Sequence, residues 1–515
     1  MLQKFKSILV TLLLTVPLLS CNTCEGLEGG WTVMVWLDGD NNLENSAMAD
    51  FNEMEYGLYL AGLTDPSVDR KIRIIVQVDR HPGYDNNTTY TGSNWSDTRR
   101  YRIRPDPENS GEWVSERLDN DMGEVNMGDA AELKDFIEYC HEHFPAENYA
   151  LILWNHGGGL MKKVSSNESD AAGTTEAISK DICTDDTNDD QLYTGEITDV
   201  LTDAHSVKFL GFDACLMGML EVAYEYRPGV TGKFGADAIC FSPAEEQADG
   251  WDYVRILTRL GGADSDGDTA DPENDPCYDA LAVTANEFAA LCAKEYADAG
   301  STYNTLQTQT AVDNTLVDNV KAAMDAFAAA IAQESGYKSV IEGIRGSGTS
   351  ATAPTMNYFT ESSAERWKTW PFFDLYDFVL RVKAQSMSTE VNNAADDLMS
   401  AISGYILYSY GGISYKGYTS GLAGSTGTTS FVNGSNGLSF FFTDGDGSYS
   451  TGTYLAEQWW YTSLDTDTWR PGGNYYGKLD FCSGDGDGVV DNWFELIMQM
   501  YHDGDYVNTH PGPAY

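Results

Sequence analysis

Runs of apolar residues that end in turn-forming residues recur along the first half of the chain. One run extends from Trp31 to Leu37 and is followed by the polar loop 38–42, and similar runs cover 71–78, 149–154 and 208–212. Strands that are buried on both faces show such near-continuous apolar stretches. The pattern therefore predicts strands of a sheet that is covered on both sides.

Helices are predicted between these strands. One covers 44–60, and a second is capped by Asp129 and continues to His143, before Pro145. A third is expected from Met217 to Tyr226, directly after a strand. Strands that alternate with helices are typical of a parallel α/β sheet, in which ligands bind at the carboxyl ends of the strands.

The second half of the chain gives a less regular pattern. Alanine-rich stretches at 280–297 and 316–333 predict helices, and 437–442 predicts a strand. The chain has 515 residues, more than the roughly 250–300 at which a single core stops growing. The acidic, polar loop 261–275 is the best boundary between a first and a second part.

The first residues have the pattern of an export signal. Lys4 and Lys6 precede an apolar stretch, 8–19, which is too short to span a bilayer comfortably. The sequence LLSC, ending at Cys21, resembles the cleavage box of bacterial lipoproteins, in which the cysteine is lipidated. The alternative is an ordinary secretory signal. We expect an exported protein that is anchored to the outer membrane or cell surface by lipid alone, and otherwise a periplasmic or secreted one.

Composition narrows the classes of function. The formal net charge is -48, and such a surface repels phosphate backbones, which excludes nucleic-acid binding. It attracts cationic peptides and calcium, although solubility alone would also account for the charge. The nine cysteines are too few for a disulfide scaffold and show no paired zinc spacing.

One histidine and one cysteine stand where a parallel sheet binds its ligands. His156 follows the strand 149–154 and precedes three glycines, and Cys215 follows the strand 208–212. Cys215 also opens the predicted helix, whose N-terminus would lower the pKa of the thiol. The backbone N–H groups of Gly157 and Cys215 could hold an oxyanion. Each residue alone could be structural, and the joint placement favours a catalytic pair.

Three sequence blocks, in order, resemble those of the clostripain family of cysteine peptidases. Two later segments, DLYDF (374–378) and GLSF (437–440), resemble its later blocks, so that the likeness covers most of 31–442. The three blocks are WTVMVWLDGDNNLE (31–44), LWNHGGG (153–159) and GFDACLMG (211–218).

The resemblance implies a caspase-like fold and a cysteine endopeptidase that cleaves after Arg, and also after Lys, through a His156–Cys215 dyad and a thioester. It puts the acidic pocket residue on Asp213. A second pocket carboxylate would lie downstream, and this chain departs from the family there by carrying Pro243-Ala244. The choice among its candidates stays open; they are Asp237, Glu245, Glu246 and Asp249. No third residue is nominated to orient His156.

The resemblance also implies self-activation by cleavage after a basic residue between the two catalytic blocks. The polar loop 162–190 offers Lys162, Lys163 and Lys180. The chemistry itself needs no cofactor, and calcium commonly supports activity in the family. Near the end, Asp485, Asp487 and Asp491 approximate a calcium loop, but a serine replaces its first carboxylate and Glu495 falls one position late. An acidic turn before a helix is the favoured alternative.

These inferences combine into one expected organisation. The partners would be peptide or protein substrates with basic residues, and the protein would act as a monomer. The rival interpretation is an inactive surface lipoprotein that binds peptides or glycans through aromatics such as Trp459 and Trp460. The predicted divisions are a lipoprotein signal peptide (1–20), a tether (21–29), a caspase-like catalytic core with a mostly parallel sheet (30–262), the C-terminal α+β part of the peptidase (263–480) and an acidic C-terminal tail (481–515).

Overall fold

The fold is described from a computed structural model of the chain. No helix within the described parts of the chain has the length and apolar character needed to cross a membrane. The described residues are 27–62, 72–160, 182–244, 246–247, 249–262, 280–303, 308–345, 355, 358, 372–411, 437–443, 476–484 and 489–502.

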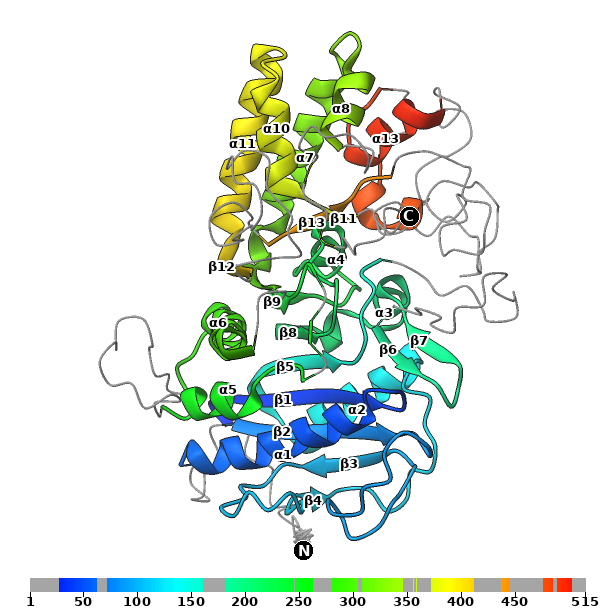
Figure 1. The fold of residues 1–515 in the computed structure, drawn as a ribbon, viewed down its shortest axis with the longest axis vertical. Helices are drawn as coiled ribbons and strands as arrows, with labels where there is room; N and C mark the ends of the chain where they lie inside the picture. The colour runs from blue at the N-terminus through cyan, green and yellow to red at the C-terminus, as the bar shows by residue number, and fades with distance from the viewer. Residues whose placement is uncertain are drawn as a thin grey trace, which may run out of the picture.

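A nine-stranded mixed sheet forms the centre of the molecule (Figure 1). Its order is β12-β10-β9-β8-β5-β1-β2-β3-β4, and the five strands from β9 to β2 are parallel, with antiparallel strands on both sides. The expected α/β class is thus confirmed. The strands are β1 (Leu27–Gly39), β2 (Ile72–Arg80), β3 (Arg99–Arg102), β4 (Glu116–Arg117), β5 (Ala146–Trp154), β8 (Val207–Asp213), β9 (Ala236–Phe241), β10 (Thr308–Asp313) and β12 (Ile406–Gly411).

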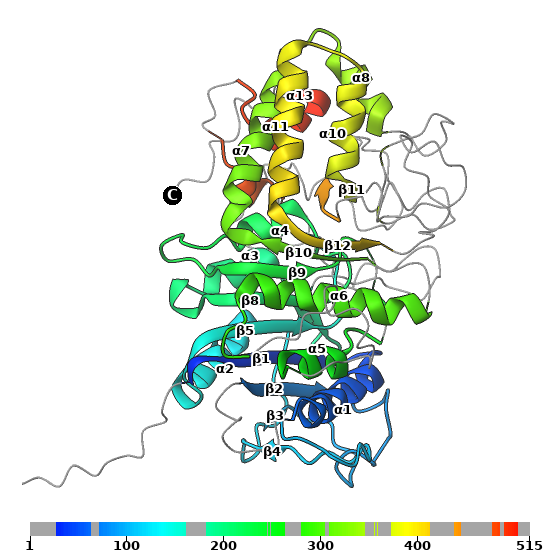
Figure 2. The same ribbon diagram turned by 90° about the vertical axis from the view of Figure 1, so that its left-hand side faces the viewer.

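Helices cover both faces of this sheet, as its apolar strands require (Figures 1 and 2). Along β1, Val33 and Val35 belong to one hydrophobic cluster, and Met34 and Trp36 belong to the other, because successive side chains point to opposite faces. The first cluster includes residues of α1 (Glu44–Leu60), α5 (Tyr253–Leu260) and α6 (Ala285–Tyr303). The second includes residues of α2 (Ala130–His143), α3 (Thr194–Val200) and α4 (Leu220–Glu225).

A second, mainly helical region stands at one end of the sheet, in the upper part of Figure 1. Its core is aromatic, with Phe378, Phe440 and Phe442 packed around the buried Trp493. It contains α7 (Val317–Ala332), α8 (Tyr337–Arg345), α10 (Leu375–Ala384), α11 (Thr389–Tyr405), α13 (Trp493–His502), the strands β11 (Phe372–Asp374) and β13 (Ser439–Phe441), and the short helices η2 (Asn314–Leu316), η4 (Tyr476–Lys478) and η5 (Asp480–Cys482). A hairpin of β6 (Ile182–Asp185) and β7 (Asp190–Leu192), and η1 (Asp203–His205), complete the described elements.

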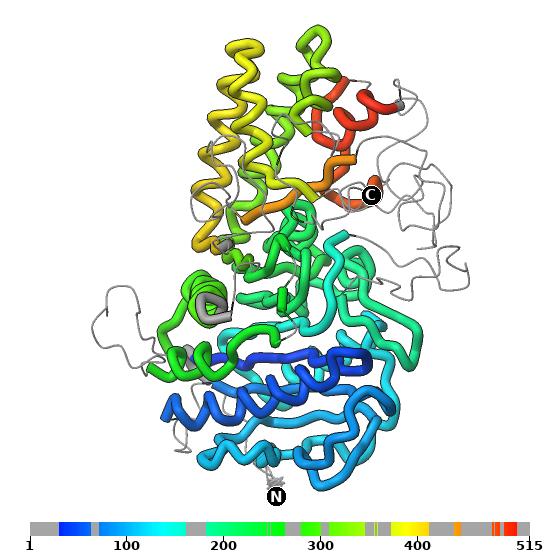
Figure 3. The backbone as a smooth tube through the Cα atoms, in the orientation of Figure 1, coloured from blue at the N-terminus to red at the C-terminus, as the bar shows by residue number. Residues whose placement is uncertain are grey.

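Two predicted boundaries differ from this arrangement. Strands β10 and β12 extend the central sheet, so residue 262 does not separate two cores. The described residues after 480 do not form a tail, because α13, red in Figure 3, packs into the helical region. Its Trp493, Phe494 and Ile497 are buried. Acidic residues around α13 favour the prediction of an exposed tail, but the helix also has an apolar face that packs against the helical region.

Candidate active site

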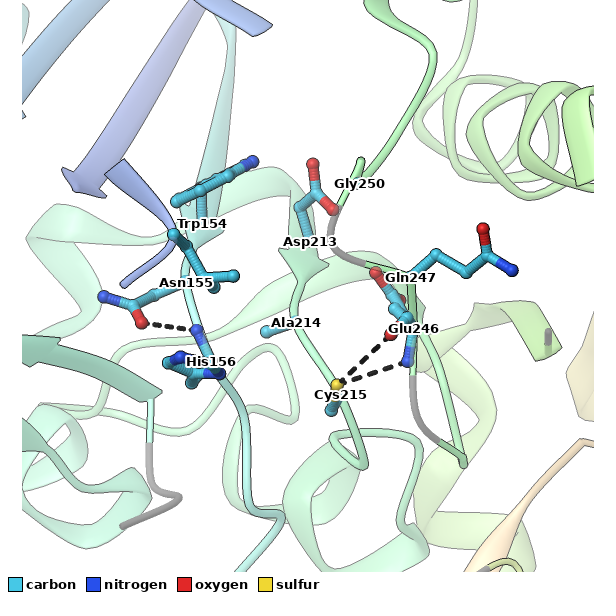
Figure 4. Close-up of a pocket in the computed structure, with 10 residues that line it drawn as sticks. Trp154, Asn155, His156, Asp213, Ala214, Cys215, Glu246, Gln247 and Gly250 are labelled. Atoms are coloured by element: carbon cyan, nitrogen blue, oxygen red, sulfur yellow. Dashed lines mark hydrogen bonds between the residues drawn. The ribbon is translucent and has the colours of Figure 1, made fainter. Parts of the chain in front are cut away.

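Strand pairing brings the two predicted catalytic residues to the same place. β5 and β8 are parallel neighbours in which Trp154 pairs with Asp213, and the backbone N–H of Asn155 donates to the Asp213 carbonyl over 3.2 Å. His156 and Cys215 each lie two residues beyond this pair. Both therefore stand at adjacent carboxyl ends of the sheet and line the same pocket (Figure 4).

The turn that carries Cys215 differs from the expectation. Helix α4 begins at Leu220, and Cys215 lies before it in a tight turn where Leu216 has φ +64°. The N–H of Leu216 donates to Ala244 O (2.8 Å) and that of Gly218 to Ser242 O (2.7 Å). The unusual Pro243-Ala244 segment thus supports the turn, and the predicted helix N-terminus does not act on the thiol.

The Cys215 sulfur instead faces the backbone of Glu246. The Glu246 N–H donates to Sγ over 3.2 Å, and Sγ lies 3.8 Å from the Glu246 carbonyl oxygen. A backbone N–H that points at the sulfur stabilises negative charge on it. The Glu246 N–H therefore supplies the stabilisation of the Cys215 thiolate that was expected from a helix N-terminus.

His156 has a partner that the sequence analysis did not nominate. Its Nε2 lies 2.8 Å from Oδ1 of Asn42, in the loop after β1. An amide oxygen can only accept, so this contact places the proton of the neutral ring on Nε2 and leaves Nδ1 as the base. The neighbouring Asn155 fixes the loop by donating to Asp38 Oδ2 (2.7 Å) and to Thr184 O (3.1 Å).

Gly157 packs directly against the nucleophile turn. A Cβ at this position would lie 2.9 Å from the Cys215 nitrogen and would collide with the Cys215 carbonyl oxygen. Only glycine lets the two backbones approach this closely. The structure therefore brings the two predicted oxyanion donors, Gly157 and Cys215, together.

The pocket beside Cys215 has a volume of about 320 Å³ and an acidic wall. Asp213 is buried, and its Oδ2 accepts from Tyr253 Oη (2.9 Å) and from the Trp251 N–H (3.2 Å). Burial raises the pKa of Asp213 to about 6. The lining residues, all from described segments, are Leu43, Trp154, Asn155, His156, Asp213, Ala214, Cys215, Glu246, Gln247 and Gly250.

Two further carboxyl groups lie near Asp213: Glu246 lines the pocket, and Asp50 lies behind the lining residue Gly250. A Cβ on Gly250 would sit 3.0 Å from both Asp50 Oδ2 and Asp213 Oδ1, so these two side chains flank the same glycine. Asp50 Oδ2 accepts from Trp154 Nε1 over 2.6 Å, and Glu246 Oε1 accepts from Gln309 Nε2 over 2.9 Å. Burial, followed by the charge of Asp213, raises the pKa of Asp50 and of Glu246 well above their usual range. Burial thus disfavours the ionised forms of these carboxyl groups, and a cation bound among them would favour ionisation.

Other predicted residues lie elsewhere. Asp237 is near the start of β9, where its Oδ2 accepts from Lys208 Nζ (2.5 Å), at the far end of the strand from the pocket. Asp249 is exposed, and its charge raises the pKa of Asp50. Asp491 lies before α13, and its N–H donates to Glu495. Seven predicted site positions fall outside the described residues, namely Cys21, Lys162, Lys163, Lys180, Glu245, Asp485 and Asp487.

Sequence reasoning missed Asn42 and Asp50, and left Glu246 as one choice among several. Asn42 lies in a polar loop at the end of a buried strand, which is the signal that could have found it. Asp50 lies on the sheet-facing side of α1 among Ala47, Phe51 and Met54, all of them buried. A carboxylate on the apolar face of a predicted helix is the sequence feature that could have found Asp50.

The fold resembles that of solved cysteine proteases. Among solved structures, a secreted C11 cysteine protease of Bacteroides thetaiotaomicron matches with a TM-score of 0.54, at 15% identity over 87% of this chain and 98% of that one. An inactive zymogen C11 protease of Parabacteroides distasonis gives 0.51, at 16% identity over 80% of this chain and 92% of that one. These likenesses show the fold, a mostly parallel sheet of the caspase-like type.

The sequence comparisons define the family. The chain is 34% identical over 495 residues to clostripain of Hathewaya histolytica, covering 91% of this chain and 86% of that protein. The sequence model of the clostripain family matches residues 35–493. The protein is a cysteine endopeptidase. It belongs to the clostripain family, whose chemistry requires no cofactor.

Proposed function

We propose that this peptidase cleaves after Arg and Lys, with Cys215 as nucleophile and His156 as base. The observation that carries the proposal is the acidic wall beside Cys215, formed by Asp213 and Glu246 with Asp50 directly behind it. None of the described residues that line the pocket is Lys or Arg. Buried carboxyl groups without a cationic partner favour a ligand that supplies one, and a substrate guanidinium or ammonium does so.

The proposed mechanism follows from the same contacts. Nδ1 of His156 takes the proton of the Cys215 thiol, and the thiolate attacks the scissile carbonyl. The N–H groups of Gly157 and Cys215 hold the oxyanion, His156 returns the proton to the leaving amine, and water hydrolyses the thioester. Asn42 Oδ1 accepts from the Nε2–H of His156 in the neutral ring, which leaves Nδ1 as the base, and also in the protonated ring.

The dyad is tested by removing each member. Cys215→Ala and His156→Ala should each lower turnover by at least about 10³-fold, and the double variant should be little worse, because the two residues act as a unit. Turnover within about tenfold of wild type would contradict the assignment. Cys140→Ala, which changes a buried thiol on α2, serves as the matched control.

Specificity is tested at Asp213 with matched Arg, Lys and Gln peptides. Losing one partner of a buried charge pair costs roughly 2–5 kcal/mol, so Asp213→Asn should lower kcat/KM for Arg and Lys by about 30- to 3,000-fold. The Gln peptide should change far less. Asp237→Asn removes the same charge at a site away from the pocket and should leave kcat/KM for all three peptides unchanged. A parallel fall for all three peptides with Asp213→Asn would assign Asp213 a scaffold role.

We further propose self-activation within the connection from the His156 loop to β6. Lys162, Lys163 and Lys180 lie in this connection, and a Parabacteroides distasonis relative was solved as an inactive zymogen. Incubated wild-type protein should be cut after one of these lysines, as N-terminal sequencing would show. Cys215→Ala should stay intact, and equally fast cutting of this purified variant would contradict self-processing.

Anchoring and state of assembly complete the proposal. Cys21 would carry the lipid of an exported protein, as the LLSC sequence indicates. Cys21→Ala should move the protein from the membrane fraction to the soluble fraction, and unchanged fractionation would contradict lipidation.

Peptides are the expected partners, as in the Bacteroides thetaiotaomicron protease solved with an irreversible peptide inhibitor. Light scattering should give the mass of a monomer.

A further inference from the structure

Two short strands of the helical region lie against the loops that carry the two residues of the dyad. Ser439, on β13, forms a bridge with Met219, and Phe372 lies on β11, the antiparallel partner of β13. We propose that Ser439 is a positioning residue for the nucleophile Cys215, and that it acts through the turn 215–218. The proposal deepens the proposed function and rests on it, and it gives the helical region a part in catalysis.

Both hydrogen-bond donors of Ser439 converge on the carbonyl oxygen of Gly218. The Ser439 N–H donates to this oxygen over 2.8 Å, and the hydroxyl donates to it over 3.0 Å. Ser439 is fully buried, so water does not replace a donor that is lost there. A carbonyl oxygen offers two lone pairs, and here one residue, 221 positions further along the chain, donates twice. The two bonds fix Gly218, which stands three residues after Cys215.

The same glycine is also bound by the segment that contacts the sulfur. The Gly218 N–H donates to Ser242 O over 2.7 Å, and a Cβ on Gly218 would lie 2.5 Å from the Pro243 nitrogen. Shortly after this segment, the Glu246 N–H donates to Cys215 Sγ over 3.2 Å. The nucleophile turn is thus held between two parts of the chain, and slack at the β13 contact would change the distance between the sulfur and the Glu246 N–H.

The strand next to β13 touches the loop of His156. A Cβ at Gly159, three residues after His156, would lie 3.2 Å from Cε2 of Phe372 and 2.7 Å from the sulfur of Met219. Gly159 has φ +69°, which glycine adopts without strain. The two strands therefore contact both catalytic loops, with Phe372 beside one and Ser439 beside the other. Contact with one common sheet restricts the movement of each loop relative to the other.

Buried carboxyl groups of α4 fasten the helical region at this place. Glu221 Oε1 accepts from the Phe441 N–H over 2.8 Å and from Tyr476 Oη over 3.1 Å, and Glu225 Oε1 accepts from the Phe481 N–H over 3.0 Å. Helix α4 follows the nucleophile turn, and β13 lies beside it where the sheet meets the helical region (Figure 1). These bonds give β13 a fixed position relative to the nucleophile turn.

The first test measures turnover of an Arg peptide by the full-length protein. Ser439→Ala removes the hydroxyl and keeps the backbone N–H, and it should lower kcat by about 10- to 100-fold with KM within about twofold, because a small displacement of a reacting atom has an effect of this size. Thr355→Val is the matched control. The N–H and hydroxyl of the buried Thr355 both donate over 2.9 Å to one carbonyl oxygen, that of Ile344 on α8. This variant should keep kcat within about twofold.

Alkylation by iodoacetamide separates positioning from a general loss of stability. The rate at Cys215, followed by mass spectrometry of its peptide as the pH is varied, reports the pKa of the thiol. In Ser439→Ala the midpoint of this profile should move up by about 0.5 pH units or more, because the Glu246 N–H stabilises the thiolate less well. In Thr355→Val it should not move, even if Tm falls equally. Both variants retain the titratable groups near the sulfur, namely His156, Asp213, Glu246 and Tyr296.

A second pair of variants tests the contact with the other loop. Phe372→Leu removes ring atoms beside Gly159 and should lower kcat by about tenfold. Phe327→Leu, at a buried ring on α7, should leave kcat within about twofold. If Ser439→Ala does not fold, this pair decides the question, and equal kcat in the two leucine variants then overturns the proposal.

The positioning role is also overturned if Ser439→Ala changes kcat and the alkylation profile no more than Thr355→Val does. This failure is distinct from failure of the proposed function. The proposed function fails when Cys215→Ala retains turnover, whereas the positioning role alone fails when Cys215→Ala is inactive and Ser439→Ala is as active as the parent.

Discussion

The contact between His156 and Asn42 shows how little local sequence says about the partner of a catalytic side chain. The two residues are far apart in the chain, and they meet because β1 lies beside β5 in the sheet. A histidine whose one nitrogen is fixed by a carbonyl oxygen presents the other nitrogen in a defined state of protonation. Asn42 is therefore a positioning residue that acts through His156.

Replacing Asn42 should affect turnover more than substrate binding. Asn42→Ala should lower kcat by up to on the order of 10²-fold with little change in KM, because the ring is less well oriented. Asn42→Asp places an anion beside Nε2, stabilises the protonated ring, and should move the acid limb of the pH–rate profile to higher pH. Asn148→Ala, at the opposite end of β5, should change neither kcat nor the pH–rate profile. An unmoved profile in Asn42→Asp would contradict the positioning role.

Asp213 should make specificity depend on pH. Burial raises its pKa to about 6, and only the ionised carboxylate pairs with a substrate cation. The ratio of kcat/KM for an Arg peptide to that for a Gln peptide should therefore fall as the pH is lowered, by roughly tenfold between pH 7 and 5. The ratio cancels changes at His156 and Cys215, which both peptides share. It should be flat in Asp213→Asn, and a flat ratio in the parent enzyme would contradict the pairing.

Among the elements, α4 and α13 depart most from the sequence pattern, for different reasons. The start of α4 moves to Leu220 because the backbone after Cys215 is bound by the segment 242–244 instead of continuing as a helix. Helix α13 is covered by aromatic side chains from α10 and from around β13, far away in the sequence. Tertiary contacts decide both cases.

Helix α13 should contribute strongly to stability through Trp493. The indole is fully buried, donates to Phe441 O over 2.9 Å, and contacts three phenylalanine rings. Trp493→Ala should lower the free energy of unfolding by about 3–5 kcal/mol, measured by urea unfolding of the Cys215→Ala protein. Val489→Ala, at a side chain that is 55% exposed, should change it by less than about 0.5 kcal/mol. A similar small loss for both variants would mean that α13 is dispensable.

At the scale of the whole molecule, the acidic composition extends into the interior. Glu221 and Glu225 on α4 are buried, and they accept from the N–H groups of Phe441 (2.8 Å) and Phe481 (3.0 Å) respectively. Burial raises the pKa of each to about 7 and that of Glu53, on α1, to about 8. The folded chain therefore binds protons at pH values where the unfolded chain has released them.

Stability should fall as the pH rises through neutrality. A carboxyl group whose pKa is raised on folding contributes stability that is complete below its unfolded value, 4.5 for Glu, and is lost as the pH rises through about 7 to 8. The lowered pKa values of Asp119 and Asp480 act in the opposite direction only below about pH 4.

The Tm of Cys215→Ala in EDTA should accordingly be higher at pH 6 than at pH 8. Glu221→Gln should reduce this difference, because its side chain no longer titrates. Glu390→Gln, which removes a charge from an exposed site in the first turn of α11, should leave the difference intact. A Tm that rises between pH 6 and 8 would refute the expectation.

The sequence by itself determined which segments form strands and helices, and where the reactive groups lie along them. Hydrophobic periodicity is a local signal, so 44–60 and 129–143 are helical as predicted, and His156 and Cys215 follow strands as predicted. Their order along the chain, with helices between parallel strands, also indicated that they would share one edge of a sheet. The resemblance in the three blocks supplied the family.

Only the tertiary structure decided which strand ends are neighbours, and hence which polar groups meet. Asn42 reaches His156 because β1 adjoins β5, and Ser439 reaches Gly218 because β13 lies beside the start of α4. Asp50, on α1, lies behind the pocket beside Asp213, whereas Asp237, on β9, lies at the opposite end of the sheet. A chain this rich in acidic residues offers many equivalent candidates for a site carboxylate. They are distinguished by whether they are buried next to another site residue, and that depends on long-range packing.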